Sequence, residues 1–295
     1  MKTILLLGKN GQVGWELQHA LLPIGRVIAL DRTQLDLTRP DDIRKTIRDL
    51  SPDIIVNAAG YTTVDKAEAE PAIAMLINAT APGILAEEAK RRDALLVHYS
   101  TDYVYDGTRS TPYDEEDAPN PLNVYGKSKL AGERAIVAAG CKHLILRASW
   151  IYSARGTNFV LTMLRLARER SELPVVNDQV GSPSWAKSLA LSTAEILSCI
   201  RNPGGVSGIY HLSATGHTTR LDFAKLIIDI AKHRSNPEIQ WAKLNPITTE
   251  NYPLPAARPL FAATSKAKIK QTFGAEMPTW QEQLKSFMLS LQDAP

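Results

Sequence analysis

Residues 4–14 read Ile4-Leu5-Leu6-Leu7-Gly8-Lys9-Asn10-Gly11-Gln12-Val13-Gly14, and this stretch decides the fold of the chain. It opens with an uninterrupted apolar run, which is typical of a strand buried on both faces of a parallel sheet. Glycines follow in the pattern G-x-x-G-x-x-G and lead into an amphipathic segment that reaches residue 22. A strand, a glycine-rich turn and a helix in this order predict a dinucleotide site, because glycines allow close backbone approach and a helix N-terminus attracts pyrophosphate. An ordinary turn whose glycines only relieve strain is the alternative, and the flanking strand and helix favour the cofactor.

A second predicted strand, Val27-Ile28-Ala29-Leu30, ends at Asp31-Arg32. In a dinucleotide-binding fold this strand end recognises the adenosine ribose. Asp31 would accept hydrogen bonds from the ribose hydroxyls and favour NADH, whereas Arg32 would pair with the 2′-phosphate of NADPH. Lys9 also lies near the predicted phosphate region. The sequence therefore predicts a nicotinamide cofactor and leaves open whether it is NADPH or NADH.

Tyr125-Gly126-Lys127-Ser128-Lys129 adds a candidate catalytic pair. On a helix, Tyr125 and Lys129 project from the same face, one turn from each other. A lysine ammonium near a phenol favours the phenolate, so we expect Lys129 to lower the pKa of Tyr125 toward the working pH. Such a tyrosine can pass a proton to a carbonyl oxygen, as a nicotinamide-dependent carbonyl reductase requires. An exposed aromatic beside a solvated lysine is the alternative, and the glycine-rich turn together with Ser100-Thr101-Asp102 upstream favours catalysis.

Apolar runs and helical periods alternate through the first half of the chain. Strands are predicted near residues 3–7, 26–30, 54–57, 94–99 and 143–147, and helices near 12–22, 40–50, 72–92 and 123–139. This alternation indicates an α/β fold with a Rossmann-like, doubly wound parallel sheet. After about residue 150 the pattern loosens, with helices predicted near 157–170, 185–200, 221–233 and 279–291. We therefore expect a dinucleotide-binding domain over 1–150, to which roughly 184–215 return, and a smaller mixed C-terminal substrate lobe over 151–183 and 216–295.

Composition excludes several classes of function. The 295 residues carry a net charge of +3, which is too small to indicate a nucleic-acid partner. No apolar stretch approaches membrane-spanning length, and the apolar N-terminus is too short for a signal peptide. Cys141 and Cys199 lie in different segments without metal-ligand spacing. They predict reduced, buried thiols in a cytoplasmic protein.

Further motifs are spread along the chain. In order they are Trp15-Glu16-Leu17, Asp36-Leu37, Asn57-Ala58-Ala59-Gly60-Tyr61-Thr62, Val64-Asp65-Lys66-Ala67-Glu68, His98-Tyr99-Ser100-Thr101-Asp102-Tyr103-Val104, Pro121-Leu122-Asn123-Val124-Tyr125-Gly126-Lys127-Ser128-Lys129, Arg147-Ala148-Ser149-Trp150, Asn177-Asp178-Gln179 and Ala257-Arg258-Pro259. With the glycine-rich turn, they resemble the extended short-chain dehydrogenase/reductase superfamily and, within it, the dTDP-4-dehydrorhamnose reductase family. The resemblance spans nearly the whole chain.

This resemblance implies positions for the cofactor. The pyrophosphate would lie over the glycine-rich turn, the adenosine beside the end of the second strand, and the nicotinamide near the third and fourth strands. The implied cofactor-binding residues are, in that order, Gly8, Gly11, Gln12 and Val13; Asp31, Arg32, Asp36 and Leu37; and Gly60, Tyr61, Thr62 and Tyr99, with Tyr125 and Lys129.

The resemblance also implies a reaction. A hydride from NADPH or NADH would reduce the C4 carbonyl of dTDP-4-dehydro-β-L-rhamnose to give dTDP-β-L-rhamnose for surface polysaccharide such as O-antigen. Thr101 would hydrogen-bond the carbonyl oxygen, Tyr125 would donate the proton, and Lys129 would hold the nicotinamide ribose and tune Tyr125. The implied substrate-binding residues are Thr101, Asp102, Trp150, Asn177, Gln179 and Arg258.

Two other functions stay open. The first is an NAD(P)-dependent nucleotide-sugar dehydratase or epimerase, which the same superfamily contains. Dehydratases carry Thr-Asp-Glu where this chain has Thr101-Asp102-Tyr103, which lacks the carboxylate that would expel hydroxide. Epimerases keep their cofactor through the cycle, whereas a reductase releases it. The second is a non-catalytic, cofactor-binding regulatory subunit like that of methionine adenosyltransferase, and the intact Tyr125 and Lys129 argue against it.

The same resemblance bears on metal binding and assembly. Glu16 matches a residue through which some relatives are thought to bridge a dimer with magnesium. In the matching later segment, Trp185-Ala186-Lys187, a lysine stands where a carboxylate is needed. We therefore expect no metal, and either a monomer or a weak homodimer.

Overall fold

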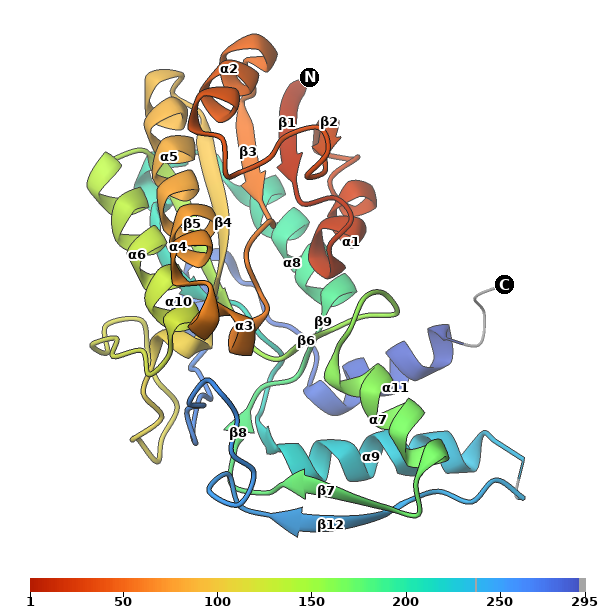
Figure 1. Ribbon diagram of the computed structural model, residues 1–295. Helices are drawn as coiled ribbons and strands as arrows, with labels where there is room; N and C mark the ends of the chain where they lie inside the picture. Colours follow the sequence, from red (N-terminus) through yellow and green to blue (C-terminus); the bar gives the residue numbers. More distant parts are fainter. Residues whose placement is uncertain (237, 292–295) are drawn as a thin grey trace.

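The computed structural model describes residues 1–236 and 238–291, so residues 237 and 292–295 of the predicted second lobe lie outside the described part. A six-stranded sheet, in which all neighbouring strands are parallel, forms its centre (Figure 1). In spatial order the strands are β10 (Gly208–His211), β5 (Lys142–Ala148), β4 (Leu95–Thr101), β3 (Ile54–Asn57), β1 (Lys2–Leu7) and β2 (Gly25–Leu30). The chain order reverses between β1 and β3, as in doubly wound sheets. The predicted Rossmann-like α/β class is therefore confirmed.

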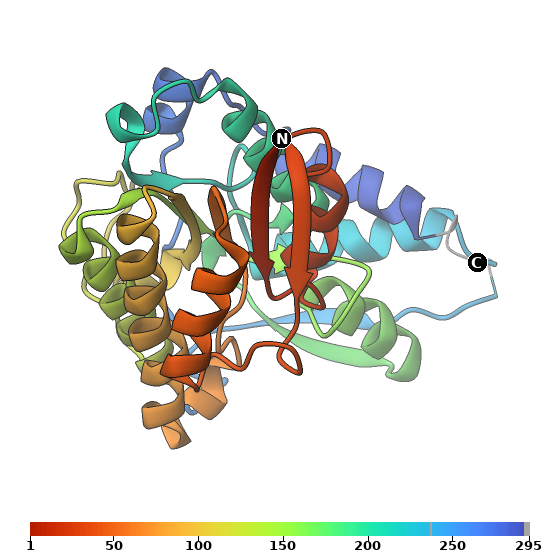
Figure 2. The same cartoon turned by 90° about the horizontal axis from the view of Figure 1, so that it is seen from above.

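Helices cover both faces of this sheet (Figure 2). On one face lie α1 (Gln12–Ala20) and α8 (Ala186–Cys199), and on the other α2 (Pro40–Leu50), α5 (Ala81–Arg91) and α6 (Val124–Ala139). Side chains along β1 alternate between the two cores, with Ile4 and Leu6 in one, and Leu5 and Leu7 in the other. Because both faces are covered, the strand is apolar at every position rather than at every second one.

A third core lies below the sheet in Figure 1. It is built from α7 (Phe159–Glu169), α9 (Arg220–His233) and α11 (Trp280–Ser290) with the parallel pair β7 (Glu172–Val176) and β12 (Lys243–Ile247). Within the second half of the chain, α8 packs on α1 and β10 pairs with β5. The division into a cofactor domain and a substrate lobe stays a prediction.

Most of the remaining elements are short connections. They are α3 (Val64–Ala69), α4 (Pro71–Met75), β6 (Ile151–Tyr152), β8 (Val180–Gly181), β9 (Ser184–Trp185), β11 (Thr218–Thr219) and α10 (Ala267–Phe273), with 3₁₀ turns at Asp102–Val104 and Gly204–Val206. The predicted strands and helices begin and end within two residues of the observed ones, apart from the helix predicted over 72–92.

That helix is interrupted. The segment Leu76–Thr80 between α4 and α5 is a π-helical turn. Pro82 is the cause, because it has no N–H to donate to the carbonyl four residues earlier, that of Asn78, and its ring crowds that oxygen. The wider turn relieves the clash. It also leaves the carbonyl of Asn78 facing α6, where a Cβ added to Gly132 would stand 2.1 Å from it.

The cysteines follow the prediction only in part. Both are free thiols, and Cys141 is buried as expected. The expectation that Cys199 is buried is wrong, because it lies at the last turn of α8 on the exposed side. Within the described residues, no helix combines the length and the apolarity that spanning a membrane would need.

Candidate active site

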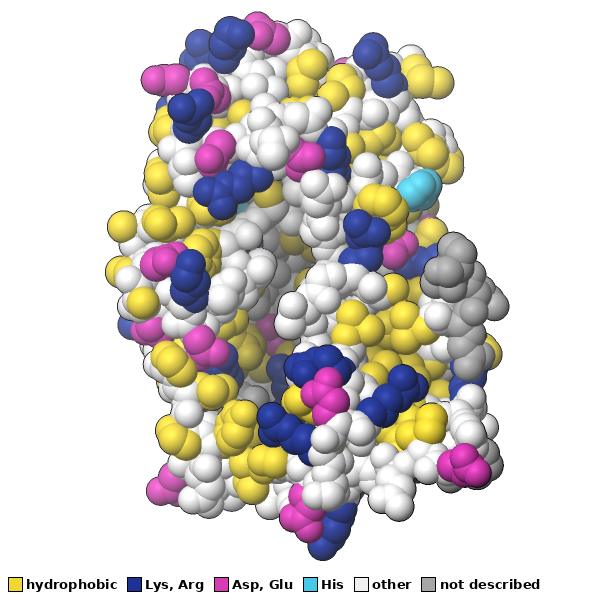
Figure 3. All heavy atoms as spheres, turned by 45° about the vertical axis from the view of Figure 1, so that its right-hand side comes forward, with side chains coloured by type: hydrophobic (Ala, Val, Ile, Leu, Met, Phe, Trp, Pro, Cys, Tyr) yellow, Lys and Arg dark blue, Asp and Glu magenta, His cyan; other side chains and the backbone are white. Residues whose placement is uncertain are grey.

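The predicted site residues follow the carboxyl ends of the parallel strands. β1 leads into Gly8, β3 leads toward Gly60, β4 ends at Thr101 and β5 leads to Trp150. Ligands of doubly wound sheets bind outside these ends, beside the point where the strand order reverses. Figure 3 shows one face of the molecule hollowed between its upper and lower parts, with Lys and Arg side chains gathered along the lower rim. A positive rim of this kind suits an anionic ligand.

The glycine-rich turn is shaped for a phosphate. Gly8 has a φ of +84°, and a Cβ added to Gly14 would stand 2.0 Å from the Gly8 carbonyl oxygen. Gly11 is the N-cap of α1, and no side chain caps this helix end. The N–H groups of Gln12 and Val13 at the start of α1 therefore remain available to an anion. These residues fit a dinucleotide pyrophosphate.

Gln12 also ties this turn to the second half of the chain. Its Oε1 accepts hydrogen bonds from the Ser153 hydroxyl and the Asn158 side-chain amide, both at 3.1 Å. The stacked guanidinium of Arg155 lies 3.7 Å from the ring centroid of Trp15 in the same region. The segment that precedes α7 is thus held against the turn that receives the cofactor. Nothing in the sequence pattern signals this contact, because the partners are far apart along the chain.

Asp31, at the end of β2, is held by several donors. Its carboxylate accepts from the N–H and hydroxyl of Thr33, at 2.9 and 2.6 Å, and from the Asn10 amide at 3.1 Å. The Lys9 ammonium lies 3.3 Å away. The hydrogen bond from the Thr33 hydroxyl, with help from Lys9, lowers the pKa of Asp31 to about 2. Asp31 is therefore an ionised carboxylate whose charge is partly neutralised by Lys9, and its contact with the ribose stays a prediction.

The neighbouring adenosine-side residues differ in exposure. Arg32 points to solvent, with 79 % of its side chain exposed and its Nε 3.7 Å from Asp36. Asp36 accepts from the N–H and hydroxyl of Thr38, both at 2.9 Å. Leu37 is buried in the core shared with α2 and α5. An acidic and two basic groups thus surround the predicted ribose position, which suits both NADH and NADPH.

Thr101 and Tyr125 are brought together where α6 begins beside the end of β4. Asn123 caps α6 by accepting from the Gly126 N–H at 2.8 Å. A Cβ added to Gly126 would stand 2.2 Å from the Tyr103 carbonyl oxygen, so glycine allows the helix to start this close to the strand end. The Tyr125 hydroxyl lies close enough to the Thr101 side chain for that hydroxyl to lower the Tyr125 pKa. Two hydroxyl groups therefore converge on one point, as a carbonyl oxygen undergoing reduction requires.

The expected lowering of the Tyr125 pKa by Lys129 is wrong for this arrangement. Burial raises the pKa of Tyr125 above its ordinary value, and the nearby Asp102 and Tyr103 raise it further, whereas the hydrogen bond to Thr101 lowers it less. Lys129 does not act on the phenol because its Nζ is held elsewhere, by the Tyr99 carbonyl. A phenol that stays protonated at neutral pH is well suited to donate a proton.

Lys129 is buried one turn after Tyr125. Its Nζ donates to the Tyr99 carbonyl at 2.5 Å and lies 3.2 Å from His98 Nε2. Burial lowers the pKa of Lys129 to about 8, against a smaller opposing effect of Glu133. Tyr99 thus contributes its carbonyl oxygen here. Alternation along β4 turns its phenol to the other face of the sheet, where it contacts Thr193 at 2.6 Å, so any contact of Tyr99 with the nicotinamide stays a prediction for its main chain.

Asn78, which the sequence pattern did not single out as functional, anchors the loop that carries Gly60, Tyr61 and Thr62. Its Oδ1 accepts from the Tyr61 N–H at 2.8 Å, and its Nδ2 donates to the Tyr61 carbonyl and to the Ser128 hydroxyl, both at 2.9 Å. Because of this clamp, Gly60 lies directly beside Lys129, and a Cβ added to Gly60 would stand 4.0 Å from Nζ. The loop and the catalytic helix are therefore fixed to each other.

Asp102 is a buried carboxyl group next to Thr101. Its Oδ1 accepts from the Thr101 hydroxyl at 3.1 Å, and its Oδ2 accepts from the Ser149 hydroxyl at 2.6 Å. Burial raises the pKa of Asp102 to about 6, and the hydrogen bonds oppose that rise. Both carboxylate oxygens are already engaged. Ser149, which the sequence motif contains without a role of its own, is thus a positioning partner of Asp102.

Trp150 has a backbone conformation that is unusual for its type. Its φ of 43° lies in the left-handed region, which a bulky residue occupies only when its surroundings hold it there. One face of the indole lies on Gly181, where an added Cβ would stand 2.3 Å from a ring carbon. The Arg220 guanidinium lies 3.6 Å from the ring centroid. The indole is therefore clamped at the end of β5, where the predicted sugar would lie.

Two guanidinium groups converge on Tyr103 next to this indole. Arg220 and Arg258 both lie close enough to the Tyr103 side chain for it to act on the pKa of each guanidinium. Arg258 also forms a two-bond pair with Asp65, at 2.6 and 2.7 Å. Sequence reasoning singled out Arg258 and missed Arg220. One signal was available, because Arg220 is the first residue of α9, and a cation at a helix N-terminus opposes the helix dipole unless another role keeps it there.

The other predicted substrate residues lie on the loop after β7. Gln179 is buried, its carbonyl accepts from the Arg220 N–H at 3.1 Å, and its side chain donates to Thr249 at 3.1 Å. Gln179 therefore contacts Arg220, which in turn lies beside Tyr103. Asn177 is exposed and donates its N–H to the Ile247 carbonyl at 3.0 Å. The structure therefore brings Gln179 toward Arg220 and Tyr103 and leaves Asn177 at the surface.

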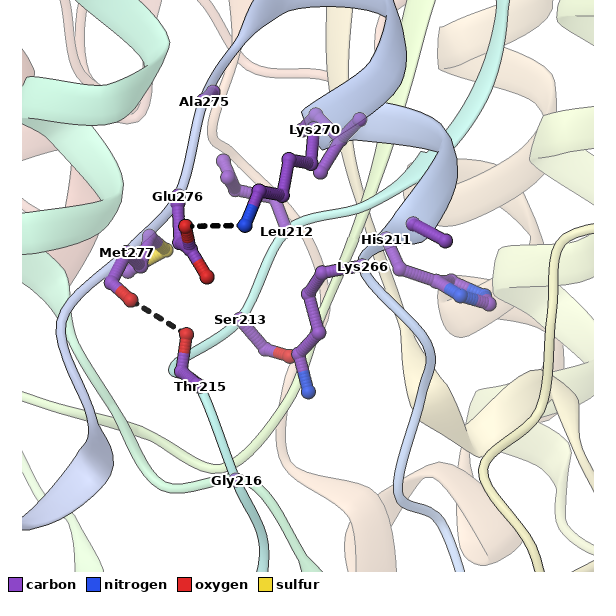
Figure 4. A pocket seen from close by; sticks show the side chains of 12 residues that line it. His211, Leu212, Ser213, Thr215, Gly216, Lys266, Lys270, Ala275, Glu276 and Met277 are labelled. Atoms are coloured by element: carbon purple, nitrogen blue, oxygen red, sulfur yellow. Dashed lines mark hydrogen bonds and ion pairs between the residues drawn. The ribbon is translucent and has the colours of Figure 1, made fainter.

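A separate cavity of about 210 Å³ lies behind β10 (Figure 4). Lys270 and Glu276 form an ion pair of 2.7 Å across it, and the Thr215 hydroxyl donates to the Met277 carbonyl at 2.6 Å. Sites for drug-sized ligands usually measure about 300–1,000 Å³. This cavity is too small for a nucleotide, and the catalytic cluster does not line it. Over residues 1–236 and 238–291, no group of three or more His, Cys, Asp and Glu side chains could hold a metal ion.

The dinucleotide turn, together with a buried Tyr–Lys pair beside a threonine at the end of β4, defines a nicotinamide-dependent oxidoreductase of the extended short-chain dehydrogenase/reductase class. Residues 1–292 match the family described as RmlD substrate binding domain. The chain belongs to this family, that of the dTDP-4-dehydrorhamnose reductases.

Similar proteins agree with this placement. The chain is 47 % identical to the dTDP-4-dehydrorhamnose reductase of Escherichia coli K12 over 98 % of each chain. It is similar to the crystal structure of the Bacillus anthracis dTDP-4-dehydrorhamnose reductase in complex with NADP, with 35 % identity, a TM-score of 0.90 and coverage of 98 % of this chain and 99 % of that one. It also shares its fold with the Thermus thermophilus UDP-glucose 4-epimerase, with a TM-score of 0.81, 17 % identity and coverage of 99 % of this chain and 100 % of the epimerase.

Proposed function

We propose that the protein reduces the C4 keto group of dTDP-4-dehydro-β-L-rhamnose to give dTDP-β-L-rhamnose, with NADPH or NADH, for surface polysaccharide such as O-antigen. The observation that carries the proposal is the convergence of the Thr101 and Tyr125 hydroxyls beside the buried Lys129. An epimerase or dehydratase would need further groups that hold the cofactor or expel hydroxide.

The residues have separate roles in this reaction. The turn from Gly8 to Gly14 and the N-terminus of α1 would hold the pyrophosphate, and Lys129 the nicotinamide ribose. The bound cofactor supplies a hydride to C4 of the sugar. Thr101 and Tyr125 bind the C4 oxygen, and Tyr125 gives its proton to that oxygen as negative charge develops there. Because its pKa is raised, Tyr125 holds this proton at neutral pH.

The sugar and the diphosphate would occupy the space beyond these hydroxyls. Trp150, which is held between Gly181 and the Arg220 guanidinium, would offer the edge of its indole to the sugar ring. Asp102 orients Thr101. Arg258 and Arg220 present guanidinium groups that suit a diphosphate, because their planar donors match its oxygens. Asn177 and Gln179 would lie toward the nucleotide end.

A direct assay tests the proposal. We expect the purified protein to consume NADPH or NADH when dTDP-4-dehydro-β-L-rhamnose is added, with formation of dTDP-β-L-rhamnose. The cofactor should leave the protein on gel filtration. Cofactor that stays bound while the sugar is epimerised without net oxidation of NADPH or NADH would replace this function with that of an epimerase.

We also infer that the reaction runs in the cytoplasm, with a dTDP-sugar and no nucleic acid as partner, in a monomer or weak homodimer. The small net charge of +3 supports the absence of a nucleic-acid partner. Light scattering at several protein concentrations tests the oligomeric state.

Gly181 offers a test of the indole position. We predict that Gly181→Ala lowers kcat/KM for the sugar nucleotide by about 10- to 100-fold, because the new methyl would push the Trp150 ring from its place. The KM for the cofactor should stay unchanged. Gly204→Ala is the matched control, since the nearest atom to its added Cβ is 3.6 Å away. Equal kinetics for both variants would show that the indole does not contact the sugar.

Lys9 offers a test of cofactor choice. We predict that Lys9→Gln raises the KM for NADPH about tenfold more than the KM for NADH, because the uncompensated Asp31 carboxylate would repel a 2′-phosphate. Steady-state kinetics with both cofactors measure the ratio. Lys45→Gln, on the exposed face of α2 beside Asp49, is the control and should leave the ratio unchanged. An unchanged ratio in Lys9→Gln would place the 2′-phosphate elsewhere.

A further inference from the structure

Three buried side chains form a row behind the catalytic pair, and two of them have no part in the proposed reaction. Asn57, His98 and Lys129 are 0 %, 1 % and 4 % exposed. Asn57 ends β3 and is the register partner of His98 on β4. Lys129 reaches down from α6, which covers this face of the sheet. A buried polar row of this kind persists only when its hydrogen bonds are satisfied.

The hydrogen bonds give this row a direction. Asn57 Oδ1 accepts from the Ala59 N–H at 3.1 Å, so its Nδ2 is the atom that faces His98 Nδ1, also at 3.1 Å. An amide nitrogen can only donate, so Nδ1 accepts and carries no proton. A neutral imidazole must then carry its proton on Nε2. That N–H faces Lys129 Nζ at 3.2 Å.

The charge states agree with this direction. Burial holds the pKa of His98 well below its ordinary value, and Lys129 lowers it further whenever the lysine is charged, so the ring is neutral. Burial lowers the pKa of Lys129 to about 8. The Nζ uses one N–H for the Tyr99 carbonyl. An amine lone pair can accept from the His98 Nε2–H, whereas an ammonium there would face another donor.

The other groups around Lys129 act differently. On its own helix, Glu133 favours the ammonium, but its carboxylate is bound by Arg147 at 2.6 Å. Tyr125 on α6 is a protonated phenol. The loop after β3 brings Gly60, which carries no charge. Among the described contacts of Lys129, His98 is therefore the one that opposes the ammonium form through a directed hydrogen bond.

We propose that Asn57 and His98 are positioning residues: Asn57 fixes the imidazole tautomer, and His98 then presents its Nε2–H to Lys129 Nζ, which disfavours the ammonium form of the lysine. The inference rests on the proposed function, in which Lys129 holds the nicotinamide ribose through the N–H groups that the Tyr99 carbonyl does not use. Reduction then slows as the pH rises and Lys129 loses its proton, close to its lowered pKa of about 8 rather than near the ordinary value of 10.5.

The tautomer can be measured directly on the wild-type protein with ¹⁵N-labelled histidine. The chain has 6 histidines, and comparison with His98→Gln assigns the signals of His98. We expect a protonated Nε2 and an unprotonated Nδ1. A proton on Nδ1 would overturn the proposal. This measurement needs no turnover, so it tests the tautomer independently of the proposed function. The proposed function is contradicted by a different result, namely a wild-type protein that oxidises no NADPH or NADH.

The variant Asn57→Asp tests the effect of the His98 tautomer on the pH dependence of reduction. The carboxylate should accept from Nδ1–H and reverse the tautomer, so that Nε2 accepts from the Lys129 ammonium. We expect the alkaline limb of kcat/KM to move up by about one pH unit or more. The double variant Asn57→Asp/His98→Gln keeps the added charge without the imidazole, and the upward shift should be lost. The same shift in both variants, or none in the single one, would overturn the role of His98.

Discussion

Replacing Tyr125 by Phe is expected to lower kcat by about 10²- to 10⁴-fold, the usual contribution of a positioned general acid. The hydroxyl of Tyr125 lies beside the Thr101 side chain, and burial raises its pKa so that it stays protonated. Without it, the oxygen at C4 would develop negative charge with one hydroxyl donor and no proton source. Initial rates of NADPH or NADH oxidation with the keto sugar nucleotide measure the effect.

Cofactor binding distinguishes a chemical defect from a folding defect. Tyr125→Phe should bind NADPH with nearly wild-type affinity in a fluorescence titration, because Lys129 and the glycine-rich turn are untouched. Tyr210→Phe is the matched control, since Tyr210 lies on β10 and its hydroxyl donates to the Val206 carbonyl in the preceding 3₁₀ turn, away from the catalytic cluster. It should keep full activity. A fully active Tyr125→Phe protein would remove Tyr125 from the mechanism.

Replacing Arg147 by Met is expected to cost about 3–5 kcal/mol of unfolding free energy, the range for breaking a buried ion pair from one side. Both side chains of the pair Arg147–Glu133 are 2 % exposed, and they are joined by bonds of 2.6 and 3.0 Å. Ser100 donates to the same carboxylate at 2.5 Å. Methionine would leave the Glu133 charge buried with one hydroxyl donor.

Urea unfolding followed by circular dichroism measures this loss. Arg165→Met is the matched control, because Arg165 pairs with Glu169 at 2.9 Å on the exposed side of α7. It should cost no more than about 1 kcal/mol, since exposed ion pairs contribute little. Equal losses in the two variants would contradict the idea that burial of the pair matters.

This pair also supports the catalytic strand. Arg147 lies on β5 and Glu133 on α6, and Ser100 on β4 immediately precedes Thr101. The ion pair joins β5 to α6, and the bond from Ser100 to the same carboxylate ties in β4, which carries Thr101. A loss of stability in Arg147→Met should be accompanied by a loss of kcat in the fraction that remains folded.

Much of the fold could be predicted from local patterns. The apolar run at Ile4 and the glycines after it predicted β1, its turn and α1, and the spacing of Tyr125 and Lys129 predicted one helix face. The helix over 72–92 was predicted as continuous, because the effect of Pro82 on a carbonyl four residues earlier was not taken into account. The return of β10 to the main sheet was predicted only as part of the segment 184–215, without the bounds of the strand.

The site was harder to predict, because its details depend on contacts between distant segments. Arg220 lies over Trp150, and Asn78 holds the loop of Gly60, although each is far from its partner in sequence. The direction of the Tyr125 pKa was predicted from its own helix alone. Burial against β4 reverses that direction.

By itself the sequence determined the parallel sheet, the glycine-rich turn and the placement of tyrosine and lysine on one helix face. These features follow from periodicity and spacing along the chain, which are local properties. Only the tertiary structure decided that Lys129 is held by Tyr99 and His98 rather than by Tyr125. The physical reason is that pKa values and side-chain orientation are set by burial and by hydrogen bonds across strands, and neither exists until the chain has folded.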